Sequence, residues 1–154
     1  MKLDKDKYII VEIIPDNSNP DVGNICQLQA LKLNGLTLID RFDYRLDSSK
    51  IDNIAIKKAT NYDNDMFSYV YDDNTILNDF KNWVEDYPLI LIENDYTSNY
   101  LKEINNKKEL VYPYLGLEHS YDVFDKIIDK YNLEPSNHLV DLIYEAIIYE
   151  SNKK

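Results

Sequence analysis

Apolar and polar residues alternate along the first third of the chain in a way that predicts strands. Residues 8–14 (YIIVEII) form an apolar run that one carboxylate, Glu12, interrupts. Residues 24–33 (NICQLQALKL) alternate in part, as expected of a strand with one buried face. The Asn-Gly pair at 34–35 is the strongest short-range signal of a two-residue hairpin turn, and residues 36–46 (LTLIDRFDYRL) return as its partner. The pattern predicts three consecutive antiparallel strands.

Further along the chain, apolar residues recur at the spacing of amphipathic helices. A cap at residues 73–75 begins the first helix, Pro88 ends it, and the apolar run 89–93 is a short strand of the kind that is covered on both faces in a parallel sheet. More helices are expected around 100–104, at 124–131 and at roughly 137–150. This order predicts one α/β domain over residues 1–154, with a mixed central sheet of antiparallel and parallel strands flanked by helices.

The charge of the chain bears on its partners. The 154 residues carry 17 Lys and Arg against 28 Asp and Glu, a formal net charge of −11, and the basic residues are spread out rather than gathered in a stripe. Proteins that bind phosphate backbones unaided usually show such a stripe. Nucleic-acid binding is therefore not expected, unless bound metal ions reverse the local field.

Composition also bears on the compartment. No apolar run approaches the roughly 20 residues of a membrane span, and the first ten residues, MKLDKDKYII, do not have the pattern of a signal peptide. The single cysteine, Cys26, excludes an internal disulfide. We expect a cytoplasmic protein without a membrane partner, since a reducing compartment suits this cysteine usage.

Short stretches along nearly the whole chain follow one another in an order and spacing that are hard to obtain by chance. They are the strand at 8–14, the hairpin at 24–42, TNYDNDM (60–66), FKNW (80–83), ENDYTS (93–98), and His138 followed after four residues by IYEA (143–146). In this order they resemble the motifs of the proofreading-type 3′–5′ exonucleases, the DEDD family. The resemblance implies a ribonuclease-H-like fold.

At the catalytic positions the chain departs from this family. Glu12 and Ile14 stand where the family's opening strand carries Asp-x-Glu, Ser98 stands at the Asp of the second motif, and Ile143 at the last Asp. His138 stands at the position of the family's general base. No residue in the shortened segment 110–121 matches the third motif.

The chemistry that the resemblance implies is two-metal phosphodiester hydrolysis, in which Mg²⁺ ions about 4 Å apart clamp the attacking and leaving oxygens. Magnesium requires hard oxygen ligands, and Glu12 is the one acidic ligand position retained. We therefore expect no intact catalytic residue and no metal, only a vestigial site at the five positions just named. The neighbouring acids Asp16, Asp95 and Asp141 are poorly placed to replace the lost ligands.

Simpler interpretations of the remaining polar residues stay open. Glu12 fits a sheet position at which a carboxylate reaches solvent or a backbone donor, and His138 fits a solvated or capping residue near a helix start. The stripe of His138, Asp141 and Glu145 fits either a single Zn²⁺ or the solvated face of a helix.

The sequence thus supports two hypotheses about function. The leading one is a catalytically inactive exonuclease-like domain without a cofactor, in a binding or regulatory role with a protein partner. The alternative is a weakly active or altered 3′–5′ exonuclease that acts on DNA or RNA with Mg²⁺ or Mn²⁺, through Glu12, His138 and a relocated acid. A third possibility is a likeness of architecture alone, because a fold does not fix a function.

Overall fold

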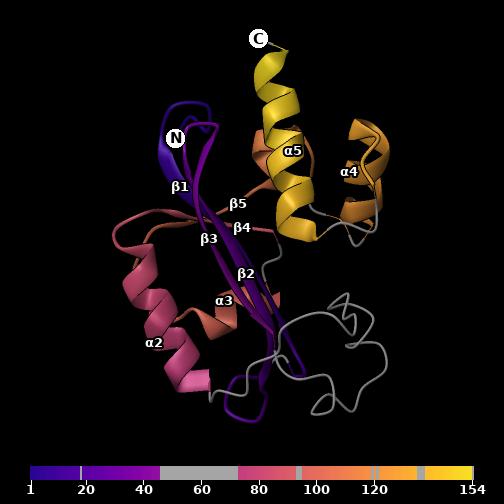
Figure 1. Cartoon of the computed structure of the whole chain (residues 1–154). Helices are drawn as coiled ribbons and strands as arrows, with labels where there is room; N and C mark the ends of the chain where they lie inside the picture. Colours follow the sequence, from indigo (N-terminus) through magenta and orange to yellow (C-terminus); the bar gives the residue numbers. More distant parts are fainter. Residues whose placement is uncertain are drawn as a thin grey trace.

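In the part of the chain that the structure describes, five strands form one mixed sheet. The computed structural model describes residues 1–17, 19–45, 73–92, 95–118, 120, 122–134 and 138–153. The strand order is β3-β2-β1-β4-β5, so β1 is central (Figure 1). The motif stretch 60–66, and Glu93 and Asn94 of the stretch 93–98, lie outside the described residues. The strands are β1 (Lys7–Pro15), β2 (Ile25–Asn34), β3 (Thr37–Arg45), β4 (Leu89–Leu91) and β5 (Lys108–Leu110).

The pairing of the strands confirms the predicted mixed sheet. β1 runs antiparallel to β2 and parallel to β4, β2 runs antiparallel to β3, and β4 runs parallel to β5. The apolar run of β1 is explained by this position, since a strand with neighbours on both edges and helices on both faces is buried all round. The short strand β5 was not predicted, because its Lys-Glu-Leu sequence shows no strand pattern.

The turn of the hairpin lies one residue later than the sequence predicted. Asn34 still belongs to β2 and pairs with Thr37, so the loop consists of Gly35 and Leu36. Gly35 has a φ of 59°, and Leu36 is not among the residues with positive φ. A positive φ at the first loop position alone is typical of a type II′ turn, which favours glycine there. A side chain at Gly35 would also lie 2.7 Å from the carbonyl oxygen of Asp4.

Among the described helices, α2, α4 and α5 occupy the regions that the sequence predicted, and the helix expected around 100–104 was placed too late in the chain. α2 and α4 agree closely with the prediction, whereas α3 begins earlier and ends at Tyr100, and a short 3₁₀ helix, η2, precedes α4. None of the helices in the described ranges is long and apolar enough to cross a membrane. The bounds are α2 (Asp73–Val84), α3 (Asp95–Tyr100), η2 (Tyr112–Leu115), α4 (Val123–Tyr131) and α5 (Leu139–Asn152).

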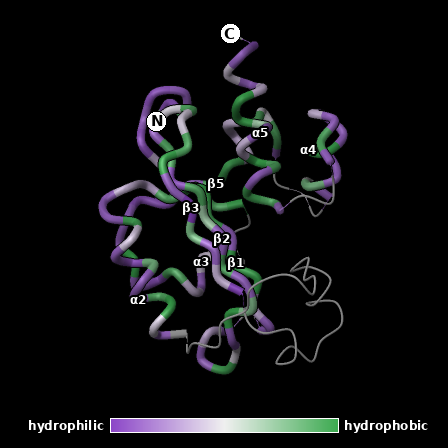
Figure 2. The backbone as a smooth tube through the Cα atoms, viewed as in Figure 1, coloured by the Kyte–Doolittle hydropathy of each residue, from purple (hydrophilic) through white to green (hydrophobic). Residues whose placement is uncertain are grey.

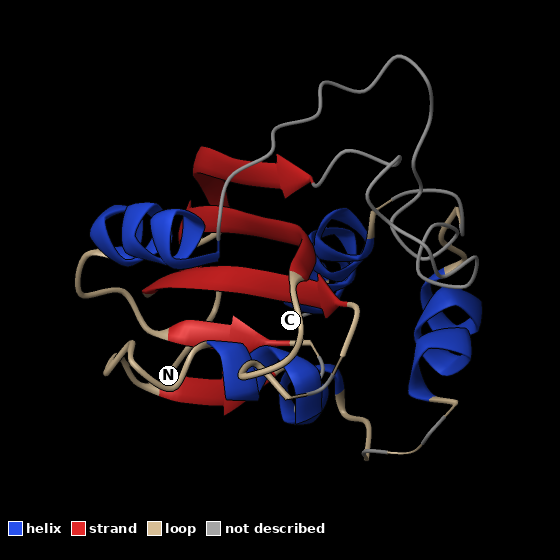
Figure 3. Cartoon of the chain, turned by 90° about the horizontal axis from the view of Figure 1, so that it is seen from below, coloured by secondary structure: helices blue, strands red, loops and turns tan. Residues whose placement is uncertain are grey.

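The sheet separates two hydrophobic clusters, one on each face. Side chains of α2 and α3 cover one face together with Ile9, Val11 and Ile13 of β1. Side chains of η2, α4 and α5 cover the other together with Tyr8 and Ile10. Figures 1 and 3 show the helices on opposite sides of the sheet, and Figure 2 shows the apolar stretches along the central strands. The alternation along β1 thus decides which of its residues face α5.

Candidate functional site

The face of the sheet beneath α5 carries four of the five positions of the sequence-predicted site. Successive residues of a strand point to opposite faces, so Glu12 and Ile14 share the face of Tyr8 and Ile10, which pack with α5. Both residues are half-buried. The strand register sets further residues beside them in three rows across β1, β2 and β3, namely Ile14–Gln27–Arg45, Glu12–Gln29–Asp43 and Ile10–Leu31–Arg41.

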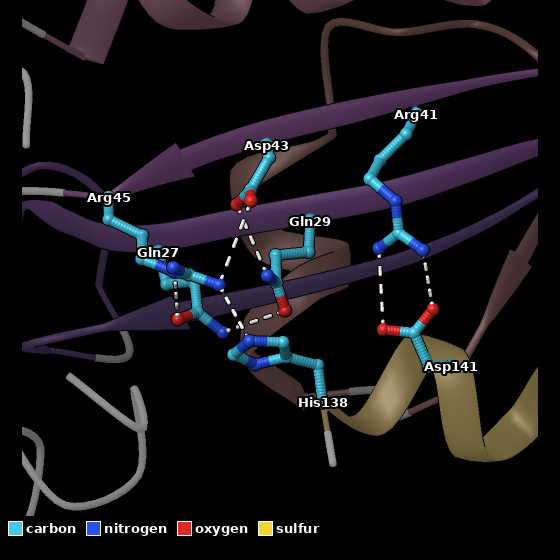
Figure 4. A network of polar contacts seen from close by, with 7 residues as sticks. All are labelled: Gln27, Gln29, Arg41, Asp43, Arg45, His138 and Asp141. Carbon is cyan, nitrogen blue, oxygen red and sulfur yellow. Dashed lines mark hydrogen bonds and ion pairs between the residues drawn. The ribbon is translucent and has the colours of Figure 1, made fainter. Parts of the chain in front are cut away.

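Four side chains in the first two rows form a closed ring of polar contacts (Figure 4). Arg45 Nε donates to Gln27 Oε1 at 3.2 Å, and Gln27 Nε2 donates to Gln29 Oε1 at 3.1 Å. Gln29 Nε2 donates to Asp43 Oδ1 at 3.1 Å, and Asp43 Oδ2 lies 3.6 Å from Arg45 Nη2. Arg45, Gln27 and Gln29 are 5%, 2% and 1% exposed. Each buried polar group of the ring therefore has a partner within the protein, as such groups require.

His138 joins this ring from α5. It is the N-cap residue of that helix, but its imidazole makes no capping hydrogen bond. Instead its Nε2 lies 2.7 Å from Arg45 Nη2. A guanidinium has only donors and keeps its charge, so Nε2 must be the acceptor and the ring proton sits on Nδ1. The lone pair that a general base would use is already engaged by Arg45.

Electrostatics agree with a neutral imidazole. Burial lowers the pKa of His138, and the positive charge of Arg45 lowers it further, while the carboxylates of Asp43 and Asp141 act in the opposite direction. A buried base next to a cation favours its uncharged form. The contact between Arg45 and His138 therefore persists at neutral pH.

A second arginine ties β3 to α5 in the third row. Arg41 donates to both carboxylate oxygens of Asp141, at 2.6 and 3.3 Å. This bond with Asp141 raises the pKa of Arg41. The pair is partly exposed, with side-chain exposures of 40% and 28%. The first turn of α5 is thus fixed to β3 by two arginine contacts, one buried and one at the surface.

Ile143 belongs to α5 itself, on the side of the helix that is buried. It is fully buried in the hydrophobic cluster that also holds Ile10, Val140 and Ala146. The topology therefore brings Glu12, Ile14, His138 and Ile143 to one side of the sheet. A carboxylate at position 143 would enter hydrocarbon rather than a hydrated cleft.

Ser98 is positioned by the short helix α3. Its neighbour Thr97 is buried, and the Thr97 hydroxyl accepts a hydrogen bond of 3.2 Å from the backbone N–H of Ile13. This contact fixes α3 to the carboxyl half of β1. Ser98 itself is half-buried, while Tyr100 and Leu101 pack in the cluster on the opposite face of the sheet. Ser98 is thus attached to β1 near Glu12 and Ile14 without belonging to the ring beneath α5.

Among the residues that the structure describes, the ligand groups on this face do not fit the two magnesium ions that the family resemblance implies. Such a site needs several convergent anionic oxygens. Glu12 supplies one carboxylate, Asp43 supplies a second that is paired with Arg45, and Ile14 supplies hydrocarbon. A fixed guanidinium also repels a divalent ion placed beside it. Within the described ranges, no group of three or more His, Cys, Asp or Glu side chains could hold a metal ion.

The stripe on α5 does not form a zinc site either. His138 contacts Arg45, Asp141 pairs with Arg41, and Glu145 is exposed to solvent. The ligand interpretation of this stripe was wrong, because His138 and Asp141 each contact a different arginine of β3.

Sequence reasoning missed Gln27, Gln29, Asp43 and Arg45. A signal was present, since two glutamines stand at a spacing of two on a mostly apolar strand, and charged residues alternate with aromatic ones on the next. Such spacing places them on one face of neighbouring strands. Which of them meet depends on the register, which the displaced turn changes.

Comparisons with known proteins give the fold. No family model matches the chain, and no curated protein matches its sequence. Solved structures of exonuclease I are similar in fold. A product-bound structure aligns with a TM-score of 0.64 and 9% identity, covering 97% of this chain and 44% of that chain. Escherichia coli exonuclease I in complex with a dA16 oligonucleotide aligns with a TM-score of 0.61 and 9% identity, covering 97% and 41%.

A zinc-bound form of the Escherichia coli exonuclease I complex with single-stranded DNA gives a TM-score of 0.57 and 8% identity, covering 94% of this chain and 39% of that chain. The chain thus spans less than half the length of these neighbours. The similarity confirms the predicted ribonuclease-H-like α/β fold, and at this identity it concerns the fold alone.

Proposed function

We propose that the chain is a catalytically inactive exonuclease-like domain that acts as a binding or regulatory module. The observation that carries this proposal is the content of the sheet face beneath α5. A buried guanidinium and its hydrogen-bonded ring stand beside Glu12, and Ile143 is sealed in hydrocarbon. Two-metal hydrolysis would need a carboxylate cluster there.

His138 supports the same proposal. Its Nε2 accepts a hydrogen bond from Arg45, so it has no lone pair free on that nitrogen to take a proton from water. Breaking the contact would leave a buried cation with fewer partners, which is costly. A general base on this face would have to be another group.

The partner we propose is a protein. The net charge of −11 opposes contact with phosphate backbones, and no bound metal is expected to reverse it. We expect no measurable binding of short DNA or RNA at physiological salt. We also propose a cytoplasmic location, because a single buried cysteine suits a reducing compartment.

Exonuclease assays test the proposal. The purified protein would be incubated with 3′-labelled single- and double-stranded DNA and with RNA, in Mg²⁺ and in Mn²⁺, with exonuclease I as the positive control for single-stranded DNA. We expect no release of label above that of a chelator control. Because traces of a contaminating nuclease can mislead, Glu12→Gln and Asp43→Asn are assayed beside the wild type.

The assay also decides the alternative of a weakly active enzyme. Metal-dependent activity that both variants abolish would come from this site and would overturn the inactive interpretation. Activity that both variants retain would belong to a contaminant. A sub-micromolar complex with an oligonucleotide, measured by fluorescence anisotropy, would contradict the proposal of a protein partner.

A further inference from the structure

Three acceptor groups from three different elements converge on the guanidinium of Arg45. Gln27 of β2 offers its amide oxygen at 3.2 Å, His138 at the start of α5 offers Nε2 at 2.7 Å, and Asp43 of β3 offers a carboxylate oxygen at 3.6 Å. Each presents a lone pair to the same positive charge (Figure 4). Together they have the composition of a cation site.

The groups around Arg45 are also held by contacts that do not involve Arg45. Gln29 holds both Gln27 and Asp43 by hydrogen bonds, so the amide and the carboxylate keep their orientation. His138 is held by α5, whose buried residues pack on the sheet and whose Asp141 is fixed by Arg41. The fold, and not Arg45 alone, therefore holds the three acceptor groups in position.

The donor types indicate which cations fit. One imidazole nitrogen, one carboxylate oxygen and one amide oxygen suit a transition-metal ion such as Zn²⁺ or Co²⁺ better than Mg²⁺, which prefers oxygen ligands alone. Imidazole binds metal through a neutral nitrogen, and Nε2 already is the unprotonated nitrogen here. The geometry would accept a planar guanidinium equally well, because that is what it holds now.

We infer that Gln27, Asp43 and His138 form a cation-binding site whose resident ion is the guanidinium of Arg45, and that this site binds a divalent transition-metal ion once that side chain is removed. The inference goes beyond the proposed function, because it assigns a ligand class to the site whether or not the domain hydrolyses nucleic acid. The guanidinium of Arg45 thus joins α5 to β2 and β3 through its contacts with His138, Gln27 and Asp43.

The first test compares two replacements of similar length. Arg45→Lys keeps a positive charge at the site and Arg45→Met removes it while keeping hydrocarbon volume. If the site binds a cation, the melting temperature of Arg45→Lys should exceed that of Arg45→Met by several degrees, because Arg45→Met leaves Asp43 and His138 facing an uncharged group. If Arg45→Met is as stable as Arg45→Lys or more so, the residue serves only packing and the inference is wrong.

The second test empties the site. Arg45→Ala is titrated with Co²⁺, and we expect ligand-field absorption in the visible range, displaced by Zn²⁺, together with a rise of several degrees in melting temperature. The wild type and Arg41→Ala, which removes the neighbouring arginine outside the ring, serve as controls and should show neither change. The double variant Arg45→Ala with His138→Phe should lose the absorption.

Failure of Arg45→Ala to fold would not leave the inference untested. In that case refolding is followed by circular dichroism with low millimolar Zn²⁺ or ethylguanidinium, which should restore the folded signal. No recovery with either cation, or absorption that persists in the double variant, would contradict the site. None of these readouts depends on nuclease activity, so their failure is separate from a failure of the proposed function.

Discussion

Replacing Ile143 by Asp would put a carboxylate back at one position of the implied metal site. The side chain of Ile143 is fully buried in the cluster beneath α5. Truncating such a residue to alanine costs about 2–5 kcal/mol. A charge in the same apolar surroundings adds several kcal/mol more, or raises the pKa of the new carboxyl until it is neutral. We expect a total loss of about 5 kcal/mol at neutral pH.

A loss of that size is comparable with the whole stability of a typical domain. For a chain of this length about 1 kcal/mol corresponds to about 2–4 °C, so the melting temperature of Ile143→Asp should fall by about 10–20 °C. Ile143→Ala is the matched control, because it creates the cavity without the charge. Thermal denaturation followed by circular dichroism measures both.

The pH dependence separates charge from cavity. A new carboxyl with a raised pKa in the folded state binds more protons there than in the unfolded chain, whose Asp pKa is about 3.9. Stability therefore falls as pH rises from about 4 toward the raised pKa. We expect Ile143→Asp to lose more, relative to Ile143→Ala, at pH 7 than at pH 4.5. Equal melting temperatures for the two variants at pH 7 would show that position 143 lies in a hydrated cleft.

Two other predictions follow from single residues. Gly35→Ala should unfold at a clearly lower temperature than Gly116→Ala, although both glycines have positive φ. A Cβ at Gly35 would lie 2.7 Å from the backbone oxygen of Asp4, whereas the nearest atom to a Cβ at Gly116, outside its own chain neighbours, would be 3.8 Å away. Equal melting temperatures of the two variants would refute the close approach at Gly35. The lowered pKa of His138 implies stability that is complete above about pH 6.5 and declines as pH falls through that value toward the folded-state pKa. His138→Gln keeps an acceptor for Arg45 and should not show this decline. If the difference in melting temperature between wild type and His138→Gln stays the same from pH 7.5 to 5.5, the prediction is contradicted.

Much of the fold could be predicted from local patterns. β1 reads as a buried strand because it is apolar on both faces, and the Asn-Gly pair marks the hairpin. The register of that hairpin could not be predicted, since a type II′ turn at Gly35 and Leu36 competes with the turn that the pair itself favours. β5 has only three residues and owes its structure to pairing with β4. Tertiary contacts, not propensity, define that strand.

The candidate site was predictable at fewer positions. The family resemblance pointed to positions 12, 14, 98, 138 and 143. The ring around Arg45, which lies on the same face as four of them, depends on cross-strand register and on where α5 sits over β3. Neither can be obtained from spacing along one strand. The roles of the five positions in a vestigial site stay a prediction.

A thermal melt of the wild type in Mg²⁺ tests the central claim, that the metal site of the fold has been lost, most directly. An ion present at a hundred times its Kd for the folded state stabilises that state by about 2.7 kcal/mol, which raises the melting temperature by about 5–10 °C here. We predict a change below about 1 °C between millimolar Mg²⁺ and sodium chloride of the same ionic strength. A rise of several degrees that chelator reverses and Glu12→Gln abolishes would show a working metal site and contradict the account.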